Sequence, residues 1–264
     1  MPATLAEYAA ERQAFLENIA AGLQADGRFL AAWLLGSLGR GEEDEVSDID
    51  LAVVVGLPYQ DALCARPWLT GPQAPPERLG LVSRFGEPAV IYENHNNARP
   101  GGTLTSVVYA NGLVVDWVLI PQETAVRPVR VRLLFDQVGI PVEDLPVETT
   151  AQRTAGASDR VAFFWMMAAV ACKYLLRGDG PAFYSVLQML DRLVVEVRRM
   201  LQGQDAPWQR APRQALAVDR SGQEASLRDA CKQMLEQMPL LTMPGGQVPE
   251  QEMNVIDLLL RLRK

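Results

Sequence analysis

Residues 36–55 read Gly-Ser-Leu-Gly-Arg-Gly-Glu-Glu-Asp-Glu-Val-Ser-Asp-Ile-Asp-Leu-Ala-Val-Val-Val and predict a tight acidic segment that leads into a buried strand. The β-branched run that ends the stretch is typical of strands. Because residues i and i+2 of a strand share a face, Asp48 and Asp50 project together and Ile49 turns the other way. Two carboxylates on one face repel each other unless a cation joins them, and hard oxygen ligands favour Mg²⁺. The pair therefore predicts a metal site.

The start of the same stretch predicts a phosphate contact. Gly36 follows a short apolar run, and a glycine at a strand end lets the backbone approach a ligand closely. Ser37 comes next, where a helix start would offer the serine hydroxyl and backbone N–H groups to phosphate oxygens. We therefore expect Gly36 and Ser37 to bind phosphate groups.

A third carboxylate interrupts a later apolar run. Asp116 lies in the middle of Val114–Val118. An acid in this position is costly to bury unless it is paired or binds a metal. We expect Asp116 to lie beside Asp48 and Asp50, which requires its strand to pair near Leu51–Val55.

Apolar spacing divides the chain into an α+β first half and an all-α second half. Strands are expected from short apolar runs at residues 30–35, 51–55, 89–92, 104–109 and 113–120. The last two runs flank Asn111-Gly112, the strongest short hairpin signal. Helices are expected from capping residues and helical spacing at residues 4–23, 161–177, 181–201, 223–237 and 251–261. We expect one domain over residues 1–145, with a mixed sheet and flanking helices, and a helical bundle over residues 146–264.

The composition argues against several classes of protein. The 264 residues include 25 Lys plus Arg and 32 Asp plus Glu, and the net charge of −7 does not suit a general nucleic-acid binder. The apolar run at residues 161–172 is shorter than the roughly 20 residues that cross a bilayer, and the N-terminus lacks a signal core. Three cysteines without a CxxC pair argue against a thiolate zinc site, and a single histidine, His95, removes mechanisms that need two. We expect a cytoplasmic protein whose chemistry comes from carboxylates.

The Gly-Ser element, the Asp-x-Asp pair and the lone acid on a later strand resemble the motifs of the DNA polymerase β-type nucleotidyltransferase superfamily. The resemblance covers residues 36–55 and 113–120. In outline, the helical second half is similar to that of bacterial antibiotic nucleotidyltransferases, which modify aminoglycosides or lincosamides.

This resemblance implies a nucleotidyltransferase domain that moves a nucleoside monophosphate, AMP from ATP, to a hydroxyl of a small molecule such as one of those antibiotics. It implies that Asp48 and Asp50 hold Mg²⁺, in a site of two ions. It also implies that Gly36 and Ser37 contact the triphosphate. Asp116 then completes the metal site or accepts the hydroxyl proton. The implied partners are a nucleoside triphosphate and a small hydroxylated acceptor, with neither nucleic acid nor membrane.

Three other residues are candidates for roles in the reaction. Lys173 places a cation on an otherwise apolar helix, where it is expected to reach a triphosphate as a point charge. Some of these enzymes use a glutamate as base, so Glu87 and Glu93 stand beside Asp116 as candidates for accepting the proton. The identity of the acceptor, the nucleotide preference and the oligomeric state stay open.

The alternative from another class is a non-catalytic or antitoxin-like regulatory protein that retains the fold. The helical ribonucleases that partner minimal nucleotidyltransferases need an arginine a few residues before a histidine. The nearest arginine before His95 is Arg84, which is too distant for that motif. A fused toxin is therefore disfavoured.

Overall fold

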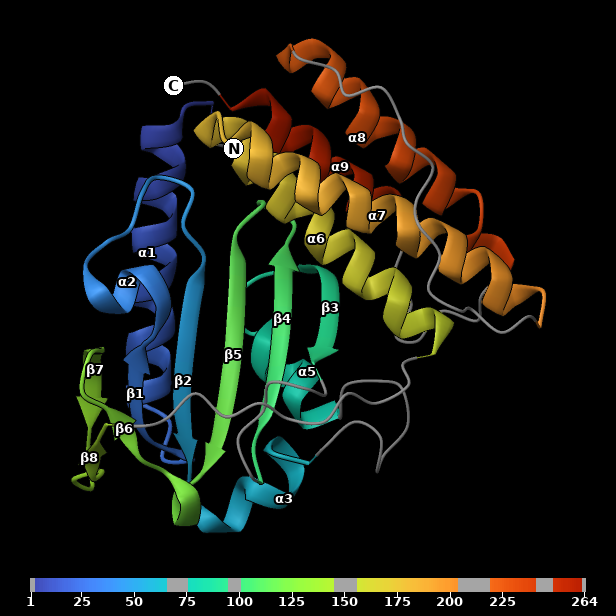
Figure 1. Cartoon of the computed structure of the whole chain (residues 1–264). Coiled ribbons are helices and arrows are strands. Elements are labelled where there is room, and N and C mark those ends of the chain that lie inside the picture. Colours follow the sequence, from blue (N-terminus) through green and yellow to red (C-terminus); the bar gives the residue numbers. More distant parts are fainter. Residues whose placement is uncertain are drawn as a thin grey trace.

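A mixed six-stranded sheet lies at the centre of the first half of the chain, in the order β3-β4-β5-β2-β1-β7 (Figure 1). The structure, a computed structural model, describes residues 3–65, 76–94, 101–144, 156–203, 219–240 and 249–262. The strands of this sheet are β1 (Phe29–Leu34), β2 (Ile49–Val55), β3 (Pro88–Asn94), β4 (Thr103–Tyr109), β5 (Val114–Pro121) and β7 (Arg132–Asp136). Two short strands, β6 (Arg127–Pro128) and β8 (Val142–Glu143), form a separate sheet. The expected α+β class with a mixed sheet is confirmed.

Long helices lie at both ends of the chain, and short ones lie between the strands. The helices are α1 (Leu5–Gln24), α2 (Gly36–Arg40), α3 (Gln60–Leu63), α5 (Pro76–Ser83), α6 (Ala157–Arg177), α7 (Gly180–Leu201), α8 (Arg220–Leu235) and α9 (Pro249–Arg261). Short 3₁₀ turns are η1 (Leu57–Tyr59), η2 (Gln122–Thr124) and η3 (Met238–Leu240). Each helix expected from the sequence is present. None of the described helices combines the length and the apolar character needed to cross a membrane.

Different helices cover the two faces of the sheet. Strand register places four side chains in one row across β2, β5, β4 and β3, namely Asp50, Asp116, Ser106 and Tyr92. Tyr92 packs on Phe163 of α6 with the ring centroids 5.1 Å apart, so this row faces the C-terminal helices. Alternate residues face the other way, into an apolar core that α1 and α5 cover.

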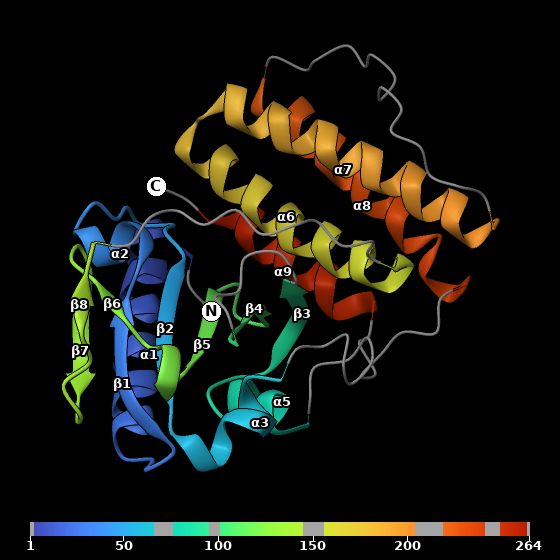
Figure 2. The same cartoon turned by 60° about the horizontal axis from the view of Figure 1, so that its bottom comes forward.

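The C-terminal helices form a layer of their own on one side of the sheet (Figure 2). Helix α6 packs against α7, α8 and α9, and it reaches the sheet at β3 and β4. One buried apolar cluster contains Val90, Val108 and Val114 of the sheet together with Phe164 and Trp165 of α6. The expected boundary between residues 145 and 146 lies outside the described residues, but the helical half is packed directly on the sheet.

The predicted hairpin is confirmed, and it sets the position of the third acid. Strands β4 and β5 are antiparallel and meet at Asn111-Gly112, where Gly112 has a φ of +84°. The Tyr8 hydroxyl of α1 donates a 2.9 Å hydrogen bond to the Gly112 carbonyl, which ties the first helix to this turn. Beyond the turn, β5 runs parallel to β2. The strand that carries Asp116 therefore lies beside Leu51–Val55, as predicted.

Candidate active site

Two of the three predicted acids are direct neighbours in the sheet. Asp50 of β2 and Asp116 of β5 are register partners on parallel strands. Neighbouring strands lie about 4.8 Å apart, so the two side chains leave the same face side by side. Asp48 lies one residue before β2. The structure thus brings Asp50 and Asp116 together and places Asp48 at the edge of the same site.

Burial makes this pair of carboxylates costly to ionise. Burial, with a smaller contribution from the neighbouring Asp116, raises the pKa of Asp50 to about 6, although Arg40 acts in the opposite direction. Burial also raises the pKa of Asp116, and a hydrogen bond with the Ser106 side chain partly offsets that rise. Two poorly solvated carboxylates on adjacent strands attract a cation, because a nearby positive charge stabilises both ionised forms.

The Gly36 backbone lies directly against the side chain of Asp50. Its φ is +56°, and a Cβ added at this position would lie 1.8 Å from Asp50 Oδ2. The N–H of Leu35 donates a 2.8 Å hydrogen bond to the Asp50 carbonyl, so the end of β1 is fixed against the acid. The sequence predicted that glycine was needed for close approach to a ligand. In the structure it is needed for close approach to one of the acids.

Ser37 lies in the first turn of the short helix α2, where it is half-buried. Its carbonyl accepts hydrogen bonds from the N–H groups of Gly41 and Glu42, which closes the turn after β1. The serine thus begins a helix, as predicted, and lies next to the glycine that contacts Asp50.

Lys173 lies against one of the predicted metal ligands. It extends from α6, is 1% exposed, and forms an ion pair through Nζ with Asp48 Oδ1. Burial lowers the pKa of Lys173 well below its ordinary value, and the guanidinium groups of Arg177 and Arg12 lower it further. The predicted phosphate-binding lysine therefore contacts Asp48, one of the predicted metal ligands.

The residues present fit a divalent cation in part. Among the residues that the structure describes, no group of three or more His, Cys, Asp or Glu side chains is arranged to hold a metal ion. Asp48 is paired with Lys173, which leaves Asp50 and Asp116 as the adjacent acids. Carboxylate oxygens are the donors that Mg²⁺ prefers. The donor chemistry therefore suits Mg²⁺ at the Asp50–Asp116 pair. Asp48, the third predicted ligand, can bind the same ion only if its ion pair with Lys173 breaks.

Glu93 lies on the opposite face of the sheet from the Asp50–Asp116 pair. Its register partner is Thr105, which in turn pairs with Trp117 rather than with Asp116. Arg78 of α5 donates to both Glu93 oxygens, at 2.9 and 3.0 Å, and the Thr105 hydroxyl donates at 2.9 Å. Glu93 is thus one half of a buried, hydrogen-bonded ion pair with a structural role.

Glu87 lies away from the acids. It is exposed and directly precedes β3, the edge strand, which is separated from β5 by β4. Two strand spacings place it about 10 Å from the strand that carries Asp116. Asp116 is therefore the one candidate base of the three that faces Asp50. His95 lies outside the described residues.

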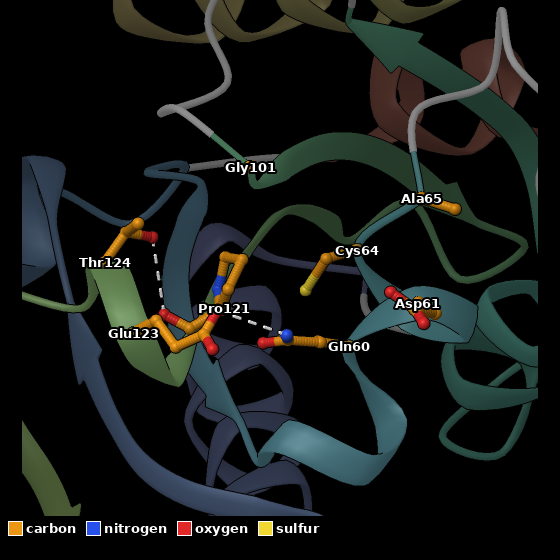
Figure 3. Close-up of a pocket in the computed structure, with 8 residues that line it drawn as sticks. All are labelled: Gln60, Asp61, Cys64, Ala65, Gly101, Pro121, Glu123 and Thr124. Carbon is orange, nitrogen blue, oxygen red and sulfur yellow. Dashed lines mark hydrogen bonds between the residues drawn. The ribbon is translucent and has the colours of Figure 1, made fainter.

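A cavity of about 460 Å³ opens at the far end of the same strands (Figure 3). Its lining includes Gln60, Asp61 and Cys64 on one side and Glu123 and Thr124 on the other. Pro121 also lines it and is the register partner of Val55, five residues beyond the Asp50–Asp116 pair. At about 3.3 Å per residue, the cavity is roughly 16 Å from the acids. It is separate from the candidate active site.

The acidic segment before β2 is more ordered than its sequence suggests. The sequence favours a solvated loop for Arg40 and residues 42–45. Arg40 instead ends helix α2, although its ion pair with Glu42 is exposed to solvent. Asp44 differs, because Arg177 of α6 binds both of its oxygens and holds its pKa at about 2. The available signal was the spacing of Lys173 and Arg177, which places both cations on one face of α6.

No protein-family model matches the chain, and no curated protein matches it either.

Proposed function

We propose that this chain is a Mg²⁺-dependent nucleotidyltransferase with a DNA polymerase β-type catalytic domain. It moves a nucleoside monophosphate, AMP from ATP, to a hydroxyl of a small molecule, with aminoglycoside- or lincosamide-like antibiotics as the acceptor class to test first. One observation carries the proposal. Asp50 and Asp116 are register partners on adjacent parallel strands, and the Gly36 backbone lies against the first of them. A half-buried carboxylate pair beside a glycine turn supports this chemistry, because carboxylate oxygens can hold a divalent cation that stabilises the attacking and leaving oxygens of a phosphoryl transfer.

The transfer is a substitution at the α-phosphorus of the nucleotide. The acceptor hydroxyl oxygen forms a bond to that phosphorus, the bond to the bridging α–β oxygen breaks, and pyrophosphate leaves. The hydroxyl proton passes to a carboxylate, for which Asp116 is the candidate that faces the site. Mg²⁺, held by Asp50 and Asp116 with Asp48 as a further ligand, would neutralise phosphate charge and align the attacking and leaving oxygens.

The other predicted residues have complementary roles in this proposal. Gly36 and Ser37 contact the triphosphate through backbone N–H groups and the serine hydroxyl. Lys173 moves from Asp48 to a phosphate oxygen when the nucleotide is bound, and it acts there as a point charge. The acceptor lies between the sheet domain of residues 1–145 and the helical domain of residues 146–264, since small-molecule sites favour such interfaces. The proposed location is the cytoplasm.

Label transfer tests this function. The full chain is incubated with ATP labelled at the α-phosphate, Mg²⁺ and a panel of aminoglycosides, lincosamides and other hydroxylated acceptors. We expect label on at least one acceptor, pyrophosphate in equal amount, and no transfer with EDTA. Label that stays on the nucleotide with every acceptor, while the chain binds ATP, contradicts transferase activity.

The Lys173–Asp48 ion pair favours a second candidate, a non-catalytic or antitoxin-like regulatory protein. A lysine ammonium that permanently neutralises Asp48 would take the place of a metal and leave a nucleotide-binding fold without turnover. Replacing Lys173 with Ala separates the two candidates. A transferase loses activity, because the phosphate contact is lost. A non-catalytic protein shows no turnover before or after the change, and only its nucleotide affinity differs.

A further inference from the structure

Helix α6 contacts the acidic segment before β2 at two points. Arg177 donates to both carboxylate oxygens of Asp44, from Nε at 2.5 Å and from Nη2 at 2.9 Å. One turn earlier on the helix, Lys173 forms its ion pair with Asp48. The two cations are four residues apart on one helix face, and the two acids are four residues apart in the segment over residues 41–48. The helix and the segment are therefore joined by two matched ion pairs.

We infer that, given the proposed function, the Asp44–Arg177 pair is an anchor that positions Asp48 when Lys173 leaves it. Asp48 can bind a cation only if Lys173 gives up its contact with Oδ1. Asp44 has no role in the proposed transfer. Arg177 therefore keeps its two hydrogen bonds to Asp44 before and after Lys173 leaves Asp48. The Asp44–Arg177 anchor then holds the segment against α6 both with and without the Lys173 contact.

Hydrogen bonds within the segment connect the position of Asp44 to the position of Asp48. Asp44 Oδ1 accepts hydrogen bonds from the Ser47 hydroxyl at 2.8 Å and from the Val46 N–H at 3.2 Å. From the other side, Arg12 of α1 donates to the carbonyl oxygens of Asp44 and Ser47, at 2.7 and 3.1 Å. Val46 and Ser47 are both buried, and Ser47 directly precedes Asp48. Loss of the anchor is therefore expected to displace Asp48, because the buried residues Val46 and Ser47 connect it to Asp44.

The anchor is expected to affect the position of the segment more than the stability of the chain. The Arg177 and Asp44 side chains are 31% and 39% exposed, and exposed ion pairs contribute little to stability. Small displacements of a reacting group, in contrast, strongly reduce a rate that depends on positioning. Arg177 is thus a positioning residue that acts through Asp44, with no contact to the reacting atoms.

The test compares the full-length wild type with Arg177→Ala, Arg177→Lys and Arg220→Ala. Arg220 forms a 2.8 Å ion pair with Glu224 within α8, so its removal is a matched control. Three quantities are measured on each protein: amide hydrogen exchange over residues 41–50, Mn²⁺ binding by loss of the free-ion electron paramagnetic resonance signal, and kcat and KM for ATP with Mg²⁺. The first two do not depend on turnover.

We expect Arg177→Ala to speed exchange over residues 41–50 about tenfold and to weaken Mn²⁺ binding. Its kcat should fall about ten- to a hundredfold, while the KM for ATP changes about twofold at most. Arg177→Lys should recover only part of the kcat. It keeps the positive charge beside Asp44, but an ammonium cannot bind both Asp44 oxygens as a guanidinium does. Arg220→Ala should match the wild type in all three measurements.

Exchange or kcat at the wild-type level in Arg177→Ala overturns the inference. An equal loss in Arg220→Ala also overturns it, because the effect is then a general loosening of the helices. A wild type that neither binds Mn²⁺ nor transfers nucleotide overturns the proposed function, and this inference with it. An active wild type with a fully active Arg177→Ala variant overturns the inference alone.

Discussion

Asp50 and Asp116 face each other across the one parallel strand pair of the described six-stranded sheet. All its other neighbouring strands are antiparallel. Parallel pairing at this point brings the beginnings of two strands to the same level, so acids near each strand start meet on one face. The active-site proposal rests on this register.

Replacing Asp116 with Asn should separate its proposed role as proton acceptor from any role in nucleotide binding. We expect turnover to fall by about 10²- to 10⁴-fold, the usual effect of losing a general base, while nucleotide affinity changes much less. Ser106→Ala is the comparison variant, because it removes the Ser106 hydrogen bond to Asp116 and keeps the carboxyl group. Steady-state kinetics and nucleotide titration of both variants make the measurement. An Asp116→Asn protein that turns over normally would show that the proton goes elsewhere.

Gly36→Ala should abolish activity through a steric clash with Asp50. The new Cβ would fall 1.8 Å from Asp50 Oδ2. Gly41→Ala is the matched control, since Gly41 has a φ of +71° but no atom within 4 Å of its Cβ position. Both variants carry the cost of a left-handed backbone, roughly 1–2 kcal/mol. If turnover and thermal stability change equally in the two variants, the contact between Gly36 and Asp50 has no catalytic role.

Glu93→Gln should destabilise the fold without a specific effect on catalysis. Removing one member of a buried ion pair leaves Arg78 uncompensated, at a cost of about 3–5 kcal/mol in the free energy of unfolding. Glu42→Gln breaks the exposed pair with Arg40 and should cost at most about 1 kcal/mol. Urea denaturation measures both. A Glu93→Gln protein as stable as the wild type but inactive would restore Glu93 as a candidate base.

The stability of the chain should fall as the pH rises from the ordinary pKa of a glutamate to about 8. Glu252 on α9 is 1% exposed, and burial raises its pKa to about 8. Between the two pKa values the folded chain holds a proton that the unfolded chain has lost, so each pH unit in this window costs about 1.4 kcal/mol. Above pH 8 the contribution levels off. Glu252→Gln should lower this slope by about 1.4 kcal/mol per pH unit relative to the wild type, in urea titrations at a series of pH values. An unchanged slope would contradict the raised pKa of Glu252.

Much of the fold could be predicted because it depends on local patterns. The capping box at the first helix is present, with Thr4 Oγ1 accepting from the Glu7 N–H at 3.2 Å. The hairpin at Asn111-Gly112 is also present, with Gly112 in the positive-φ conformation that glycine adopts readily in turns. Strand β7, Arg132–Asp136, was missed. It is a short edge strand with an irregular register against β1, so its sequence lacks a clear alternation.

The candidate site could be predicted only where two residues are close in sequence or share a strand pattern. Asp48 and Asp50 were found by their spacing, and Asp116 by its position in an apolar run. The face on which Glu93 lies depends on the register of β3 against β4, which a single sequence does not specify. The contacts of Lys173 and Arg177 join residues more than a hundred positions apart, and only the packing of α6 on the sheet determines them.

Pyrophosphate release and label transfer, measured together on the wild type and on Asp50→Asn, test the central claim most directly. The proteins are compared with labelled ATP and the acceptor panel, in Mg²⁺ and in EDTA, after circular dichroism has shown equal folding. We expect equal amounts of pyrophosphate and labelled acceptor from the wild type, strict dependence on Mg²⁺, and at least about a hundredfold less in Asp50→Asn, equivalent to about 2.7 kcal/mol of barrier. Transfer by Asp50→Asn at the wild-type rate would contradict the role of the Asp50–Asp116 pair.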